Sequence, residues 1–145
     1  MRDIRFRAKR KDNGEWTYGY VDATMYKDIA VIHTDYSTHG VDPETVGQYT
    51  GVEDSSGNPV YEGDIIAMDG NPWGIVMYND DGYFYLNDLF DDAQRDKIPF
   101  GTFLKTTCRK HQFCVSGNIH DNTDIVEEFR ARYENKCGLA DKTED

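Results

Sequence analysis

Long apolar runs, a leader segment and a cysteine framework are all missing from this sequence. Its 145 residues include only three cysteines, Cys108, Cys114 and Cys137, an odd number that suits reduced thiols better than disulfides. No stretch is long and apolar enough to cross a bilayer, and the opening residues 1–5 read as the start of the folded protein. These absences predict a protein without a membrane span, located in the cytoplasm.

Basic charge is scarce as well, because the formal net charge is −11 at pH 7. Eleven carboxylates between Glu53 and Lys97 face only two cations, whereas residues 1–11 carry six cations and one carboxylate. A protein held to a phosphate backbone needs basic surface, so the composition speaks against nucleic-acid binding. We interpret the acidic body as a solubilising surface, with a mimic of DNA as the alternative.

Aromatic residues are abundant, with ten Tyr and seven Phe, and they favour β-strands. At the N-terminus, apolar and cationic residues alternate over residues 4–9, and Asn13-Gly14 predicts a type I′ turn. We therefore expect a β-hairpin over residues 3–22. One face of this hairpin is expected to pack on the core, with the cations on a solvated edge; that face comprises Ile4, Phe6, Trp16, Tyr18 and Tyr20.

Further strands follow. Residues 29–33 could form a short buried strand, and residues 34–40 read as a loop. Three strands near residues 64–68, 73–78 and 83–86 are separated by tight turns, which is typical of a small barrel or sandwich. An acidic loop over 88–101 and a last strand near 112–116 come next, and apolar residues at helical spacing after Asn122 predict a single helix that ends at Gly138.

No cluster of residues has the spacing of a known chemical site. Cys108, His111 and Cys114 are too far apart along a strand for a zinc knuckle, and point apart on a helix. The remaining histidines have no serine or cysteine partner at a recognisable turn, and the carboxylates of residues 80–92 do not follow the EF-hand pattern. We therefore expect no catalytic residue, metal or cofactor, and an enzyme is the least favoured alternative.

One basic patch remains as a candidate. Arg5, Arg7 and Lys9 lie close in sequence to Trp16, Tyr18 and Tyr20, which are the ingredients of a platform for single-stranded nucleic acid. The ordinary interpretation, a solvated edge beside a packed hairpin, is favoured, and the nucleic-acid module stays as an alternative.

The segment Val41 to Gly51, VDPETVGQYTG, followed by YEGDI at Tyr61 to Ile65, resembles the signature of the YopX-like proteins of bacteriophages and prophages. The opening IRFR with Trp16 and the closing SGNIHDN at Ser116 to Asn122 agree with it, although Ala8-Lys9 stands where a Trp is usual, and Ser116 and His120 replace Ile and Tyr. The residues that carry the signature are Asp42, Pro43, Thr45, Val46, Gly47, Gln48, Tyr49, Thr50, Gly51, Tyr61, Glu62, Gly63, Asp64, Ile65, Gly117, Asn118 and Ile119.

This resemblance implies a mainly β fold with an SH3-type barrel or roll and one C-terminal helix, and it supplies no catalytic residue. We expect one domain over residues 1–138, with a hairpin and loop region at 1–40, a barrel-like core at 41–120, a helix at 122–137 and a tail at 139–145. The signature glycines are attributed to backbone geometry, and Tyr49 and Tyr61 to packing. The expected function is that of a non-enzymatic phage or prophage accessory protein that acts through protein contacts, as a homo-oligomer or with a host or phage partner.

Overall fold

The computed structural model describes residues 2–26, 29–88, 98–108, 112–128 and 131. The chain divides into two compact units. The first unit comprises Met1–Glu53 and Gly57–Glu62, and the second comprises Asp54–Ser56 and Gly63–Asp145. The boundary expected at residue 40 lies inside a strand of the first unit, and the expectation of a single domain stays a prediction.

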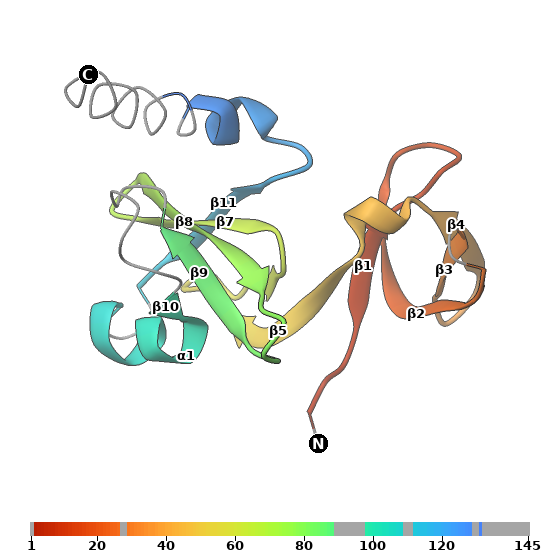
Figure 1. The fold of residues 1–145 in the computed structure, drawn as a ribbon, viewed down its shortest axis with the longest axis horizontal. Helices are drawn as coiled ribbons and strands as arrows, with labels where there is room; N and C mark the ends of the chain where they lie inside the picture. The colour runs from red at the N-terminus through yellow and green to blue at the C-terminus, as the bar shows by residue number, and fades with distance from the viewer. Residues whose placement is uncertain (1, 27–28, 89–97, 109–111, 129–130, 132–145) are drawn as a thin grey trace, which may run out of the picture. The chain divides into compact units, whose positions relative to one another are not determined.

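The first unit is an antiparallel sheet with the strand order β4-β3-β2-β1-β5-β6. Figure 1 labels β1 to β5 of this sheet. Its strands are β1 (Phe6–Lys9), β2 (Trp16–Tyr26), β3 (Ile29–His33), β4 (Thr38–Val41), β5 (Gly47–Glu53) and β6 (Pro59–Tyr61). A 3-10 turn, Pro43–Thr45, leads into β5. The N-terminal hairpin is confirmed, but the type I′ turn is wrong, because Gly14 has φ +72° while Asn13 does not have a positive φ. A six-residue loop, 10–15, makes the reversal instead.

A small core fills one side of this sheet. Ala8, Ala30, Ile32 and Val41 are buried, and Val46 packs against them. Val41 is paired with Ala30 across β4 and β3. Residues 38–40 of the expected loop 34–40 therefore belong to the strand β4, because Val41 at the end of this strand is buried against Ala30 of β3.

The second unit contains a five-stranded antiparallel sheet with the order β10-β9-β8-β7-β11. Its strands are β7 (Asp64–Met68), β8 (Asn71–Tyr78), β9 (Phe84–Asp88), β10 (Ile98–Pro99) and β11 (Cys114–Asn118). The expected meander of three strands is confirmed as β7 to β9. The last strand is present but returns to pair with β7, a long-range contact that no local pattern predicts.

A helical segment follows β10 and was not expected. It consists of α1 (Phe100–Thr102) and a π-helical turn, Phe103–Thr107. Phe100 and Phe103 are buried and stack on each other with ring centroids 6.1 Å apart, and Phe103 also contacts Trp73 at 4.9 Å. These ring contacts stabilise a turn whose Gly and Thr residues have little helix propensity of their own.

Near the C-terminus, residues 123–128 and 131 are helical, and the rest of the helix expected at 122–137 lies outside the described residues. Residues 89–97, most of the expected acidic loop, lie outside them too. Among the helices that the structure describes, none has the length and apolarity to cross a membrane. The mainly β fold with a helix near the C-terminus is confirmed, and the SH3-type geometry stays a prediction.

Candidate binding surface

The register of the β1–β2 hairpin places cations and aromatic rings on one face of the first sheet. Arg7 pairs with Tyr18 and Lys9 pairs with Trp16, and directly paired residues of antiparallel strands point to the same side. The expectation that Trp16, Tyr18 and Tyr20 share a face with the apolar residues of β1 is therefore wrong. Ala8 lies on the core side instead, opposite Thr17.

The cations of β1 are held over these rings. The guanidinium carbon of Arg7 lies 4.6 Å from the centroid of Trp16 and 5.0 Å from that of Tyr61. Lys9 Nζ lies 5.5 Å from the Trp16 centroid, and the Arg5 guanidinium lies 4.6 Å from that of Tyr49. Cation–π contacts of this kind stabilise by about 0.5–2 kcal/mol each, depending on how far they are desolvated. Because the Tyr49 and Tyr61 rings also contact each other, these cations and rings form one connected stack.

Burial divides this stack into two parts. Arg7 is only 7% exposed and Tyr61 only 2% exposed, and Arg7 Nη2 donates to the Glu62 carbonyl oxygen at 3.4 Å. Desolvation by burial raises the pKa of the Tyr61 phenol, so this ring is uncharged near pH 7. This part of the stack is structural.

The other part faces outward. Tyr18 is 49% exposed and Tyr20 is 65% exposed, and they alternate along β2 on the same face. The Tyr18 ring rests against Tyr61 at a centroid distance of 5.7 Å, which restricts its motion. Arg5 and Lys9 are half-buried beside them. We name Tyr18, Tyr20, Arg5 and Lys9 the tyrosine patch.

The patch is a local cationic site on an acidic chain. The first unit has seven cations and ten carboxylates, a net charge of −3, and the second unit has nine cations and seventeen carboxylates, a net charge of −8. Arg5 Nε already lies 3.4 Å from a carboxylate oxygen of Asp3. With Arg7 buried and Arg5 beside Asp3, this surface is a poor electrostatic track for a phosphate backbone.

The first group of signature residues supports the strand that carries the cations. Asp42 caps the 3-10 turn by accepting a hydrogen bond from the Glu44 amide at 3.1 Å. The Thr45 hydroxyl accepts from the Lys9 amide at 2.9 Å and donates to the Asp42 carbonyl at 2.7 Å. Gly47 permits a close approach, since a Cβ there would lie 2.7 Å from the Glu62 carbonyl oxygen. These residues position the backbone of β1 and β5.

Further signature residues lie in the strand pair β5–β6 or directly after it. The Tyr49 and Tyr61 rings pack with centroids 5.5 Å apart, and the Thr50 hydroxyl donates to the Val60 carbonyl at 2.8 Å. The Glu62 amide donates to the Gln48 carbonyl at 2.9 Å. These residues therefore act in the structure through ring packing, a side-chain hydrogen bond and backbone pairing.

The last signature residues meet in the second unit. Asn118 of β11 pairs with Asp64 of β7, and the Ile119 amide donates to the Gly63 carbonyl at 3.0 Å. The Asn118 side-chain oxygen accepts from the amides of His120 and Asp121, both at 2.9 Å. Two motifs more than fifty residues apart in sequence thus join at one end of a strand pair.

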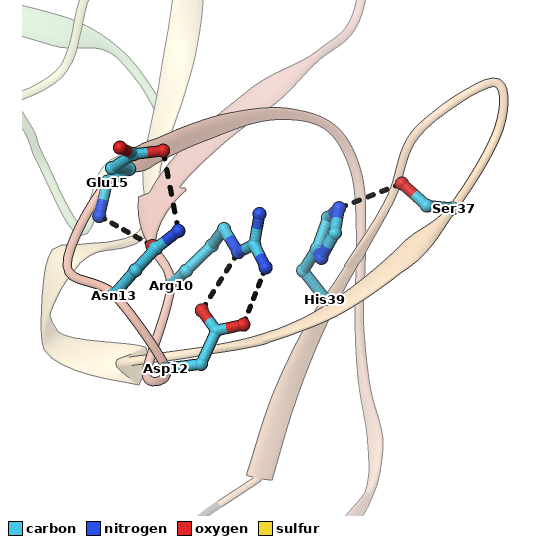
Figure 2. Close-up of polar contacts among 6 residues, drawn as sticks. All are labelled: Arg10, Asp12, Asn13, Glu15, Ser37 and His39. Atoms are coloured by element: carbon cyan, nitrogen blue, oxygen red, sulfur yellow. Dashed lines mark hydrogen bonds and ion pairs between the residues drawn. The ribbon is translucent and has the colours of Figure 1, made fainter.

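A serine–histidine pair that the sequence interpretation missed lies at the ends of the first-unit hairpins (Figure 2). Ser37 Oγ lies 2.8 Å from His39 Nε2, and also 3.0 Å from Thr34 Oγ1. Thr34 Oγ1 accepts from the Ser37 amide at 3.0 Å, so these groups fasten the β3–β4 turn. The spacing of two residues, with Ser37 directly before β4 and His39 within it, could have indicated the pair.

The nearby carboxylate of Asp12 does not complete a catalytic triad. Both of its oxygens accept from Arg10, at 2.9 and 2.5 Å (Figure 2). This hydrogen-bonded pair lowers the pKa of Asp12 and raises the pKa of Arg10. In the same loop, the Asn13 side chain accepts from the Glu15 amide at 2.9 Å. The contacts shape the 10–15 loop.

The cysteines and acidic residues do not converge on a site in the described part of the chain. Cys108 is buried and Cys114 is exposed, and burial raises the pKa of the Cys108 thiol. His111 and Cys137 lie outside the described residues. Among the residues that the structure describes, no group of three His, Cys, Asp or Glu side chains could hold a metal ion.

Comparisons with known proteins cover most of the chain. The chain is similar to protein EF1440 from Enterococcus faecalis, known from a crystal structure, with 19% sequence identity and a TM-score of 0.50 over 86% of this chain and 99% of that chain. At this identity the likeness concerns the fold alone. The curated proteins give no match. The model of the YopX protein family matches residues 5–127, and because this match spans most of the chain, the protein belongs to that family.

Proposed function

We propose that this protein is a non-catalytic binding protein of a phage or prophage, acting through protein contacts in the cytoplasm of its bacterial host. The observation that carries the proposal is the exposure of Tyr18 and Tyr20, side by side on the same face of β2. The phage setting rests on the resemblance of the signature segments to phage and prophage proteins.

The tyrosine patch has the composition of an interface. Tyr and Arg are enriched in protein–protein interfaces and among the residues that contribute most to binding. A tyrosine that is already held by a neighbouring ring loses little conformational entropy when a partner covers it, and Tyr18 is held in this way by Tyr61. The patch is thus organised for binding before a partner arrives.

Affinity capture from prophage-induced cells tests this proposal with a paired variant. We expect a protein bound to the tagged wild-type chain to be lost, or reduced at least about tenfold, in Tyr18→Ser/Tyr20→Ser, since two interface tyrosines commonly contribute more than 1.4 kcal/mol. Tyr36→Ser is the matched control, because Tyr36 is 98% exposed but lies in the β3–β4 turn. Equal capture by all three chains would overturn the proposal.

Single-stranded nucleic acid is the second candidate, favoured by the cations that lie over the rings of Trp16 and Tyr49. Fluorescence anisotropy with a labelled single-stranded oligonucleotide at low salt separates the two functions. Protein binding predicts no saturable signal. Binding that falls steeply with salt, and that disappears in Arg5→Glu/Lys9→Glu, would favour the nucleic-acid function instead.

A further inference from the structure

The β8–β9 turn of the second unit presents an acidic and aromatic surface. Asp80 and Asp81 are exposed at the turn, and Tyr78 and Tyr83, which flank it, are 48% and 40% exposed. We name these four residues the acidic tip. Its composition is opposite in charge to the tyrosine patch and equal to it in aromatic content.

Backbone and ring contacts give the acidic tip a defined shape. The Asn79 amide donates to the Tyr83 carbonyl, and the Gly82 amide donates to the Asn79 carbonyl, both at 2.9 Å. The Asn79 side-chain oxygen accepts from the Asp81 amide at 2.5 Å, and the Tyr78 ring packs edge-on against Phe84 at 5.1 Å. Because the turn is already ordered, little entropy is lost when it binds.

We propose that the acidic tip of one copy of this chain binds the tyrosine patch of a second copy. Carboxylates of Asp80 and Asp81 would pair with Arg5 and Lys9, and the tyrosines of both surfaces would cover one another. This inference rests on the proposed function, because it identifies the partner of the tyrosine patch as another copy of the chain.

Charge complementarity favours a second copy of this chain as the partner of the tyrosine patch. The chain has a net charge of −11, so a second copy offers acidic segments that attract a cationic patch. Among the described residues, the acidic tip is an ordered acidic segment that also carries exposed tyrosines. Two such chains repel each other at long range. Salt at about 0.15 M screens this repulsion over distances greater than about 8 Å, whereas charges in close contact are screened less.

Sedimentation velocity of the full chain over a wide concentration range at about 0.15 M salt tests the inference. We expect reversible self-association that weakens at least about tenfold both in Arg5→Glu/Lys9→Glu and in Asp80→Lys/Asp81→Lys, a size of effect typical of interfacial charge pairs. Mixing the two variants should restore association between unlike chains, because the reversed patch of one chain meets the reversed tip of the other, and the unchanged tip meets the unchanged patch, with opposite charges at both contacts. Placing all four substitutions in one chain re-creates opposite charges and should restore it.

A charge-matched control distinguishes the effect of reversing the charges at the acidic tip from the effect of changing the net charge of the chain. Glu44→Lys/Glu53→Lys shifts the charge by the same amount as the tip variant, and both side chains are exposed in the first unit. This control should associate at least as strongly as the wild type, because it lowers the long-range repulsion. Circular dichroism of every variant checks that each remains folded.

A wild-type chain that sediments as a monomer at every concentration would overturn the inference, and so would tip variants that associate like the wild type. Failure of the four-substitution chain to recover association while it remains folded would also overturn it. If the chain is monomeric but capture of another protein still depends on Tyr18 and Tyr20, the inference fails and the proposed function stands. If capture and self-association are both insensitive to the patch, both fail.

Discussion

Arg7 shows how much the role of one residue depends on strand register. The alternation of residues 4–9 tells which side chains share a face, but it does not tell which face of β2 lies beside them. That is set by the length of the 10–15 loop, and a shift of one residue exchanges the two faces. The sequence pattern therefore predicted that the cations share one face, but the expectation that the aromatic residues of β2 lie on the opposite face was wrong.

Replacement of Arg7 tests the structural part of the cation–ring stack. We expect Arg7→Ala to lower the free energy of unfolding by about 2–3 kcal/mol, because it removes contacts to two rings and a hydrogen bond from a charged donor. Arg7→Lys should cost less, since the charge and the aliphatic stem remain while the planar stacking is lost. Urea denaturation of the full chain measures both.

Arg2→Ala provides the control for this series, because Arg2 is exposed and carries the same charge. Its effect should stay within about 0.5 kcal/mol, as for ordinary surface substitutions. If Arg7→Ala is no more destabilising than Arg2→Ala, the stack does not contribute to stability.

At the scale of the strands and helices, local patterns predicted the elements with clear periodicity. The hairpin of β1 and β2 and the strands β7 to β9 are examples. The strand β4 was missed because its sequence, THGV, has a single apolar residue, and it exists through pairing with β3. The helical segment 100–107 was missed because ring packing stabilises it, and the partners of those rings are distant in sequence.

Gly19 tests the pairing of β2 with β3. A Cβ at this position would lie 2.1 Å from the carbonyl oxygen of His33, so the two strands could not keep their spacing. We expect Gly19→Ala to destabilise the chain by about 1–3 kcal/mol, the usual range for overpacking. Thermal unfolding followed by circular dichroism reports the change.

Gly40→Ala is the matched control, because Gly40 lies in β4 of the same sheet and a Cβ there meets nothing within 4 Å. It should be neutral or slightly stabilising, since alanine lowers the entropy of the unfolded chain. Similar losses at Gly19 and Gly40 would mean that the close approach of β2 to the His33 backbone does not limit stability.

At the scale of the whole molecule, the path of the chain could not be predicted from the sequence. The two strands β5 and β6 belong to the first unit, but Asp54–Ser56, the turn between them, belongs to the second. The signature segment also passes from one unit to the other between Glu62 and Gly63. Such an arrangement depends on pairings between distant segments, and these leave no periodic pattern in the sequence.

Asp54 holds the turn between β5 and β6, residues Asp54–Ser56, in its place in the second unit. Its carboxylate is buried, with 6% of the residue exposed, and it accepts hydrogen bonds from the amides of Ser56 at 2.9 Å and Val115 at 3.0 Å. The Ser55 hydroxyl adds a bond to the Phe113 carbonyl at 2.8 Å. The turn is therefore fastened to the strand β11 by both backbone and side chains.

We expect Asp54→Ala to lower the free energy of unfolding by about 2–4 kcal/mol, because two amides lose a charged acceptor, one of them in β11. Hydrogen exchange should show lost protection at the Val115 amide, whereas Ser56→Ala, which leaves both acceptor bonds in place, should exchange like the wild type. If Val115 stays protected in Asp54→Ala, the carboxylate does not fasten the turn to β11. Loss of protection at Val115 with retained protection in β1 and β2 would show that the second unit can open while the first stays folded, so the two units are separate in stability as well as in structure.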